Sequence, residues 1–327
     1  MIEVSIGIKA LNEEANIARC LASAQEALRF CPSGEIVLAD SGSTDRTIAI
    51  ARQFPVRIVQ LANPEERCCG AGAQLAFQEA RGAYFYLLDG DMALAPDFLP
   101  AAIAYMEAHP DVAGVGGWVT ERNVSGQEYQ VRADKAETAE RPVDHLYCGG
   151  LYRTDAVRSV GFLADRNLHA FEEFELGARL TAQGWKMVRL DRPGVDHYGH
   201  SEGGYALLWR RWKSGYAGGM GEVVRGAVGR AHGKVVLARL KPLHMALVVL
   251  FWWGLLLLAL GVRSVAGLAL LLAAPMVYFA WRRRSFRLGL YSFAVCNLLT
   301  LGLVAGFFRP RMPPETPLAV RDVTVAP

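Results

Sequence analysis

The sequence has few of the features that mark three classes of protein. Its 327 residues carry a formal net charge of only +3, which is too small to argue for nucleic acid as a partner. Its six cysteines show no paired C-x-x-C spacing, so we expect reduced, mostly buried thiols rather than a metal site or a disulfide framework. The opening residues, MIEVSIGIKALNEE, contain no basic stretch followed by an apolar core. We therefore expect no signal peptide and a cytosolic N-terminal domain.

Apolar residues are plentiful but unevenly spread. The chain is 52% hydrophobic and 20% charged, and three strongly apolar segments lie at 243–261, 264–281 and 288–308. Each approaches the roughly 20 residues that a helix needs to cross a bilayer, so we predict about three transmembrane helices. None of the segments contains an acidic residue, which disfavours a transporter or channel.

Basic residues flank these segments. One group precedes the first segment and another separates the second from the third; they are Lys234, Arg239, Lys241, Arg282, Arg283, Arg284 and Arg287. Because positive charge favours the cytosolic side, this pattern predicts a cytosolic N-terminus and a C-terminus on the far side.

The first 90 residues alternate between apolar strands and helical patterns with short connections. This pattern predicts a parallel sheet covered by helices, an α/β fold whose ligands bind beyond the carboxyl ends of the strands. Asn12 suits the N-cap of the first helix. The expected strands are 4–10, 35–40, 56–61 and 83–89, and the expected helices are 12–28, 44–54 and 70–82.

The second half continues with further strands and one acidic helix. Strands are expected at 111–119, 146–153 and 186–190, and a helix at 171–185. Residues 204–241 are basic and partly amphipathic, which predicts helices lying on a membrane surface. The predicted organisation is a catalytic domain at 1–203, interfacial helices at 204–242, a transmembrane region at 243–308 and a short tail at 309–327.

Asp89-Gly90-Asp91 ends the strand 83–89 with two carboxylates. A turn would explain the residues equally simply, since Asp and Gly are common after strands. The alternative is a divalent cation held by carboxylate oxygens, with a nucleotide diphosphate as its other ligand. Mg²⁺ and Mn²⁺ suit such sites and would neutralise a leaving diphosphate.

The segments EIVLADSGSTDRT, RGAYFYLLDGDM and FEEFELGARLTAQGW occur in that order. Together with the first strand and NEE, they resemble family 2 glycosyltransferases over about residues 4–215. This resemblance implies the GT-A fold, an inverting transfer of sugar from a nucleotide-diphosphate donor, and a Mn²⁺ or Mg²⁺ cofactor. It also implies nucleotide contacts and metal ligands. The nucleotide contacts would be Ala10, Leu11, Asp40, Arg67 and Asp89, and the metal ligands would be Asp91, Asp89 and His197.

The general base is expected in FEEFE. An inverting transfer needs a carboxylate that takes the proton from the acceptor hydroxyl. The family usually has Glu-Asp here, whereas this chain has Glu172-Glu173, so Glu173 falls at the base position and Glu172 remains an alternative. A solvated acidic helix start is the structural alternative.

Further candidates follow from the resemblance. Gly149 and Gly150 lie where relatives bring backbone close to the donor or acceptor sugar, although a strand bulge would also explain them. His200 is a second, weaker histidine candidate beside His197. Arg210, Arg211 and Trp212 resemble the Q-x-x-R-W motif of processive relatives, although Leu208 stands at the glutamine position and interfacial anchoring is an equal alternative.

The sequence therefore predicts a multi-pass glycosyltransferase of the inner membrane with a cytosolic catalytic domain. Its expected donor is a UDP-sugar, and its expected acceptor is lipid-linked, as in exopolysaccharide, capsule or lipopolysaccharide assembly. The alternatives are a processive polysaccharide synthase and a non-catalytic nucleotide-sugar-binding subunit of a synthase.

Overall fold

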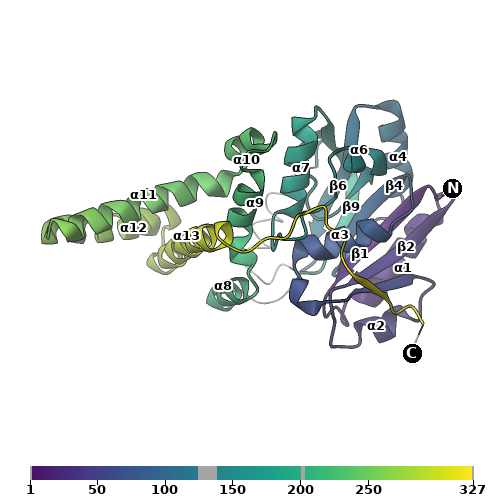
Figure 1. Cartoon of the computed structure of the whole chain (residues 1–327), viewed down its shortest axis with the longest axis horizontal. Coiled ribbons are helices and arrows are strands. Elements are labelled where there is room, and N and C mark those ends of the chain that lie inside the picture. Colours follow the sequence, from purple (N-terminus) through teal and green to yellow (C-terminus); the bar gives the residue numbers. More distant parts are fainter. Residues whose placement is uncertain (1, 124–137, 200–202, 326–327) are drawn as a thin grey trace. The chain divides into compact units, whose positions relative to one another are not determined.

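The chain divides into two compact units, and the computed structural model describes residues 2–123, 138–199 and 203–325 (Figure 1). The first unit joins Met1–Ser201 to Arg311–Pro327, and the second unit is Glu202–Pro310. Most of the segment that the sequence analysis treats as a short tail is therefore part of the first unit. The second unit is an insertion near the end of the first.

The first unit is built on a mixed sheet to which the described residues contribute ten strands. The strands β1 to β4 run parallel to their neighbours in the order β3-β2-β1-β4, whereas β5, β7, β8 and β10 pair in antiparallel fashion. The parallel sheet predicted from the first 90 residues is thus confirmed for β1 to β4, and β6 and β9 also pair in parallel. The strands are β1 (Val4–Ala10), β2 (Gly34–Asp40), β3 (Arg57–Leu61), β4 (Tyr84–Asp89), β5 (Met92–Leu94), β6 (Val112–Glu121), β7 (Arg141–Pro142), β8 (Gly150–Arg153), β9 (Lys186–His197) and β10 (Val320–Asp322).

Helices cover both faces of this sheet. Alternate residues of β2 show the two faces, because Ile36 and Leu38 join the apolar cluster that includes α1, while Val37 and Ala39 join the cluster that includes α3. This is the three-layer arrangement expected of an α/β domain. The helices are α1 (Ile17–Leu28), α2 (Thr47–Ala51), the 3₁₀ turn η1 (Pro64–Glu66), α3 (Cys69–Glu79), α4 (Phe98–Ala108), α6 (Thr154–Ser159) and α7 (Glu172–Ala182).

Two expectations about the early helices were wrong. The first helix begins at Ile17, so Asn12 is not its N-cap. Asn12 instead adopts a left-handed φ of 57°, and its side-chain oxygen accepts a hydrogen bond from the backbone N–H of Thr44 at 2.8 Å. The helix expected over 44–54 is only five residues long. The backbone N–H groups of Thr44 and Arg46, before its start, donate to side chains of the loop after β1.

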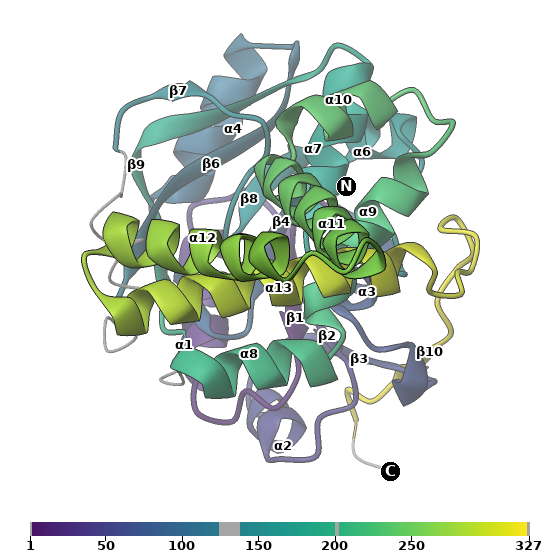
Figure 2. The ribbon, with the colours of Figure 1, turned by 90° about the vertical axis from the view of Figure 1, so that its left-hand side faces the viewer.

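The second unit consists of helices. Three of them, α11, α12 and α13, are long and apolar enough to cross a membrane, and α12 and α13 lie side by side (Figure 2). Their bounds agree closely with the apolar segments seen in the sequence. The helices are α8 (Gly204–Lys213), the 3₁₀ turn η2 (Tyr216–Gly218), α9 (Gly219–Ala227), α10 (Gly233–Arg239), α11 (Lys241–Gly261), α12 (Val265–Arg283) and α13 (Phe286–Phe307).

The last residues of the chain extend the sheet of the first unit. Strand β10 pairs antiparallel with β3, with Val320 opposite Leu61 and Asp322 opposite Val59. Two more backbone bonds continue this ladder, from Ala62 N to Ala319 O at 2.9 Å and from Val323 N to Ile58 O at 3.0 Å. The chain end is thus an integral edge strand.

Candidate active site

The carboxyl ends of β1, β2 and β4 meet at one edge of the sheet. In the parallel register, Ala10 lies opposite Asp40, and Lys9 lies opposite Asp89. Asp91 follows β4 after a single glycine, Gly90, at the same edge. The polar residues singled out in three separate stretches of sequence are therefore neighbours in space.

The loops that leave β1 and β2 are joined by side-chain hydrogen bonds. The backbone N–H of Asn12 donates to Ser43 Oγ, and that of Glu13 donates to Thr47 Oγ1, both at 2.8 Å. These bonds fix the loops against each other without regular secondary structure. They hold the rim of the site in a defined position around Ala10 and Asp40.

Asp40 is fully buried and only partly satisfied. Its Oδ2 atom accepts hydrogen bonds from the backbone of Gly42 and Ser43 at 2.9 Å and from Gln60 Nε2 at 2.8 Å. Its Oδ1 atom finds no hydrogen-bond partner among the described residues. Because buried acceptors are nearly always paired, Oδ1 is suited to a donor from a bound molecule. Beside it, Leu11 is 40% exposed, although a large apolar side chain is normally covered.

Lys9 is the residue at this edge that the sequence analysis missed. Its ammonium lies 2.5 Å from Glu172 Oε1 and 3.2 Å from Asp89 Oδ1, and its side chain is only 14% exposed. Burial acts to lower the pKa of Lys9, but the carboxylates of Asp89 and Glu172 outweigh it and hold this pKa well above its usual value. Lys9 therefore links the end of β4 to the start of α7 as a permanent cation. A lysine inside an otherwise apolar strand was the available signal.

The three glutamates at the start of α7 have different surroundings. Glu175 is buried and forms a bidentate pair with Arg179 at 2.8 Å, so it has a structural role. Glu172 is buried and held by Lys9. Glu173 is half-buried and forms no ion pair with a side chain in the described part of the chain. Burial, followed by the neighbouring Glu172 carboxylate, raises the pKa of Glu173 to about 8.

Asp91 and His197 form the second polar group of the site. Strand pairing places His197 opposite both Met92 and Glu121, and its Nε2 atom lies 3.3 Å from Asp91 Oδ2. Its Nδ1 atom lies 2.6 Å from Glu121 Oε2, which is almost fully buried. Burial acts to lower the pKa of His197, but its hydrogen bonds to Asp91 and Glu121 raise it to about 9. Glu121 was not predicted, because its contact depends on the register of β6 and β9.

These residues suit a divalent cation whose remaining ligands come from a bound phosphate. A carboxylate and an imidazole are both donors that Mn²⁺ accepts, and a carboxylate on the second imidazole nitrogen is the usual partner of a metal-bound histidine. Within residues 2–123, 138–199 and 203–325, no three His, Cys, Asp or Glu side chains are grouped to hold a metal ion alone. Burial and the nearby carboxylates Asp91, Asp89 and Asp45 raise the pKa of Glu13 to about 7, despite a bond from Asn16 that lowers it. The excess of negative charge also favours a cation.

Three residues near the site have a positive, left-handed φ. Cys148 has a φ of 57°, Gly149 a φ of 94° and Phe171, just before α7, a φ of 67°. A Cβ on Gly149 would come within 2.9 Å of the Leu87 carbonyl oxygen, so this glycine allows a close approach to β4. Gly150 begins β8, where the Leu146 side chain occupies the space of a Cβ. Such conformations concentrate at functional sites.

The remaining predicted residues lie elsewhere. Arg67 is exposed at the end of η1, with no side-chain partner among the described residues. Arg210, Arg211 and Trp212 lie on α8 of the second unit, where the guanidinium of Arg211 stacks on Tyr216 at 5.3 Å. Their predicted part in sugar binding stays a prediction. His200 lies outside the described residues.

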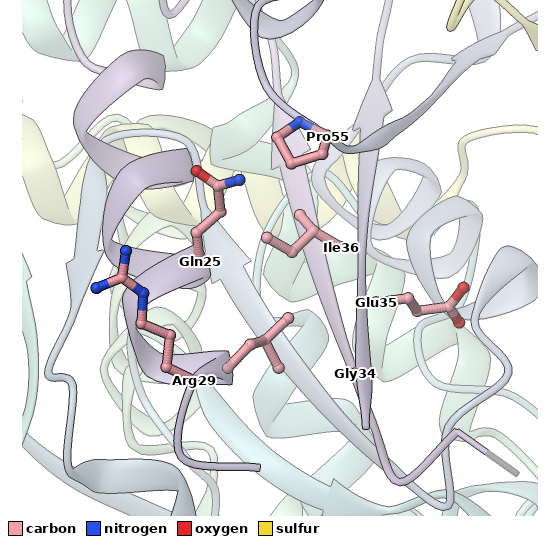
Figure 3. Close-up of a pocket in the computed structure, with 7 residues that line it drawn as sticks. Gln25, Arg29, Gly34, Glu35, Ile36 and Pro55 are labelled. Atoms are coloured by element: carbon pink, nitrogen blue, oxygen red, sulfur yellow. The ribbon is translucent and has the colours of Figure 1, made fainter. Parts of the chain in front are cut away.

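One open pocket of about 310 Å³ lies away from these residues (Figure 3). It is lined by α1 and by the beginning of β2, including Gln25, Arg29 and Glu35. Gly34 and Asp40 stand at opposite ends of β2, which places this pocket about 20 Å from the carboxyl edge of the strand. It contains none of the predicted site residues.

Comparison with known sequences identifies the domain that contains β1, β2 and β4. The model of the family described as "Glycosyl transferase family 2" matches residues 5–159. The segment of residues 5–159 is therefore a family 2 glycosyltransferase domain. The match includes β1 to β4 and the residues Asp40, Asp89 and Asp91. It ends before Glu172, Glu173 and His197.

Individual relatives agree with the match. The chain is 27% identical over 187 residues to EpsE of Bacillus subtilis (strain 168), which covers 54% of this chain and 66% of that protein. It is 30% identical over 115 residues to the dodecaprenyl-phosphate galacturonate synthase of Rhizobium johnstonii, covering 32% and 33% of the two chains. The chain thus spans less than two thirds of the length of these curated relatives.

A solved structure supports the fold. The mannosyltransferase PcManGT from Pyrobaculum calidifontis, in complex with GDP-Man and Mn²⁺, superposes with a TM-score of 0.60 at 18% identity. The alignment covers 94% of this chain and 87% of that one. This likeness shows that the chain has the predicted GT-A fold.

Proposed function

We propose that this family 2 glycosyltransferase transfers a sugar, with inversion, from a nucleotide-diphosphate donor to a lipid-linked acceptor at a membrane surface. The observation that carries the proposal is that the carboxylates at the edge of the sheet have different partners. Asp91 is paired with His197, Glu172 is held by Lys9, and Glu173 is left without an ion-pair partner among the described residues. The Asp91–His197 pair suits a metal-bound diphosphate. A carboxylate without an ion-pair partner, such as that of Glu173, suits a general base.

The nucleotide would bind at the carboxyl ends of β1 and β2. Asp40 Oδ1 is a buried acceptor that lacks a donor, and the imide N–H of uracil is a donor of the required kind. Ala10 and Leu11 would line the base pocket, and the exposed Arg67 is free to reach a phosphate. We propose a UDP-sugar as the first donor to test. Guanine offers an N–H of similar chemistry, and the neighbour PcManGT binds GDP-Man.

Asp91 and His197, with Asp89 close by, would hold Mn²⁺ or Mg²⁺. When bound, such a cation neutralises negative charge on the departing diphosphate. Glu121 would fix the orientation of the His197 ring, and Lys9 would set the position of Asp89. The chain's own contribution is to keep these groups oriented before the donor arrives.

Glu173 is the proposed general base. It would take the proton from the acceptor hydroxyl as that oxygen attacks C1 of the sugar, on the face opposite the diphosphate. A base with a raised pKa binds that proton firmly, and Glu173 has a pKa of about 8. Glu172 is a poorer candidate because its carboxylate already accepts a hydrogen bond from Lys9 at 2.5 Å.

A lipid-linked acceptor is supported by the second unit. Its three long apolar helices suit membrane association, and basic residues of α8 to α10 suit an anionic membrane surface. The Rhizobium johnstonii relative is named for a dodecaprenyl-phosphate product. We propose that the catalytic unit faces the cytosol at the inner membrane and acts in exopolysaccharide, capsule or lipopolysaccharide assembly. Gly149, Gly150, Arg210, Arg211 and Trp212 are the proposed contacts to donor or acceptor sugar.

A donor screen tests the function. Purified full-length protein would be incubated with a panel of UDP- and GDP-sugars, native lipid extract and Mn²⁺ or Mg²⁺, and nucleotide release and labelled lipid would be measured. Release of nucleotide with labelled lipid is the expected result. A protein that binds the donor but never releases nucleotide would be a non-catalytic subunit, and a long polysaccharide product would indicate a processive synthase.

Variants then test the residue roles. We expect Glu173→Gln to lower turnover at least about 100-fold, the usual contribution of a general base. Asp91→Asn should also lower turnover, because it removes a proposed metal ligand. Asp155→Asn is the matched control, because its side chain is 97% exposed and lies outside the site. Near-normal turnover of Glu173→Gln together with an inactive Glu172→Gln would move the base to Glu172.

A further inference from the structure

The two chain segments that flank the second unit both belong to the first unit. Of the ten strands in the described part of the chain, β1 to β9 lie before Ser201 and β10 lies after Pro310. The return segment is held firmly, since Arg311 pairs with the buried Asp165, and Gln78 exchanges two hydrogen bonds with the backbone of Leu318 at 2.9 and 3.0 Å. The second unit is thus anchored to the same folded body at both ends.

This connectivity restricts how the chain can cross a membrane. A folded sheet lies on one side of a bilayer, so residues 202–310 must leave and return on the same side. An odd number of crossings would place β10 on the side opposite β3, yet the two are hydrogen-bonded neighbours. The topology expected from sequence, with three crossings and the C-terminus on the far side, is therefore wrong.

The distribution of basic residues indicates which helix does not cross. Four arginines lie at the junction of α12 and α13, within residues 282–287, and Arg309 and Arg311 follow α13. Both ends of α13 are therefore basic, which favours the cytosolic side for both. The turn between α11 and α12, residues 262–264, carries a single arginine. If only α11 and α12 cross, both strongly basic segments lie on the same, cytosolic side of the membrane.

Contacts within the second unit support the same assignment. Near its start, the ring of Tyr291 on α13 packs against that of Tyr205 on α8 at 5.3 Å. Near its end, Gly302 and Gly306 lie so close to the backbone of η2 that no Cβ would fit. Helix α13 also packs on α12 and α11, where the indole N–H of Trp253 donates to Asn297 Oδ1 at 3.0 Å. Its other contacts are with α8, η2 and α9, which directly follow the catalytic unit in the chain. We infer that α13 runs along these surface helices.

Helices α11 and α12 are joined by a side-chain hydrogen bond next to a proline. Pro275 lacks an N–H, which frees the carbonyl of Leu271 four residues earlier. The indole N–H of Trp252 on α11 donates to this carbonyl at 2.9 Å. Because an unpaired carbonyl is costly in lipid, this bond suits a pair of helices inside the bilayer. Their 21 and 19 residues span about 31 and 28 Å, close to the hydrocarbon thickness.

We propose that the chain crosses the membrane twice, as an α11–α12 hairpin, while α13 stays on the catalytic side and the C-terminal strand returns to the catalytic sheet. The lipid bilayer is the partner of the exposed apolar side chains of the hairpin, among them Phe251, Leu257 and Leu270. This topology does not depend on the reaction that the site performs.

Labelling of single introduced cysteines tests the topology in the full-length protein. Each variant would be treated with a membrane-impermeant maleimide in sealed vesicles, before and after permeabilisation, with the labelling of the wild-type thiols subtracted. Phe30→Cys, on an exposed residue of the catalytic unit, marks the catalytic side. Val325→Cys and Arg287→Cys should be labelled like Phe30→Cys, whereas Arg263→Cys in the hairpin turn should need permeabilisation.

The outcomes are distinct. If Val325→Cys reacts only after permeabilisation while Phe30→Cys does not need it, the return of the C-terminus is refuted. If Arg287→Cys behaves in this way, α13 crosses and the assignment of the hairpin is refuted. If Arg263→Cys reacts in sealed vesicles whose catalytic side faces outward, the hairpin does not reach the far side and the two-crossing topology is refuted.

Discussion

Replacing Lys9 with methionine should destabilise the first unit. The Lys9 ammonium is the cation that Glu172 and Asp89 share, at 2.5 and 3.2 Å. Methionine has nearly the same length and keeps the packing, so the change removes mainly the charge. Two carboxylates, with Glu173 nearby, would then be left without their counter-ion.

The magnitude follows from the burial of the three groups. Breaking a buried ion pair by removing one partner typically costs about 3–5 kcal/mol. The side chain of Glu172 is only 6% exposed, but that of Asp89 is 32% exposed and is partly screened by water. We therefore expect the lower end, about 3 kcal/mol. For a unit of about 200 residues this lowers the melting temperature by about 6–12 °C.

Thermal exposure of buried thiols provides the assay. Cys20 is fully buried in the first unit, so a thiol-reactive dye reports its unfolding in the full-length protein in detergent. The control is Lys9→Met combined with Glu172→Gln, which removes the uncompensated charge. The double variant should recover more than half of the lost stability, since contacting residues couple by about 0.5–3 kcal/mol.

Either of two results would refute this reasoning. A Lys9→Met protein that melts within 2 °C of the wild type would show that the shared cation contributes little to stability. A double variant no more stable than Lys9→Met would show that the loss comes from packing and not from the unpaired Glu172.

Three further predictions concern the site. Glu121→Gln should weaken Mn²⁺ binding about 10–100-fold by releasing the His197 ring, as measured from free Mn²⁺ by electron paramagnetic resonance, and unchanged affinity would contradict this role. Gly149→Ala should cost about 1–3 kcal/mol more than Gly161→Ala, because both have positive φ but only Gly149 faces a close backbone carbonyl. Because a base must be deprotonated, and Glu173 has a pKa of about 8, kcat/KM should fall as the pH drops below about 8. An acid limb near pH 4.5 would exclude it.

Sequence reasoning was accurate where local patterns determine structure. The β-α alternation of the first 90 residues gave the four parallel strands and the edge at which Asp40, Asp89 and Asp91 meet. Apolar length likewise gave α11, α12 and α13. These features depend on spacing within about 20 residues, which a single sequence displays directly.

Sequence reasoning missed the features that depend on partners far away in the sequence. The bond between Lys9 and Glu172 joins residues 163 positions apart, and that between Glu121 and His197 joins residues 76 positions apart. Strand β10 has three exposed residues and no apolar pattern, so only its pairing with β3 reveals it. The proposed return of the C-terminus to the catalytic side rests on the same distant pairing.

The late return of β10 also has a consequence for synthesis of the protein. The edge strand β3 leaves the ribosome early, but its partner is made after the whole second unit. At 5–20 residues per second, making that unit takes on the order of ten seconds. During this time β3 presents open backbone groups of the kind that invite pairing with other chains. The nascent chain is therefore most vulnerable to aggregation while its long apolar helices are being made, and a premature stop after α13 would make this vulnerability permanent.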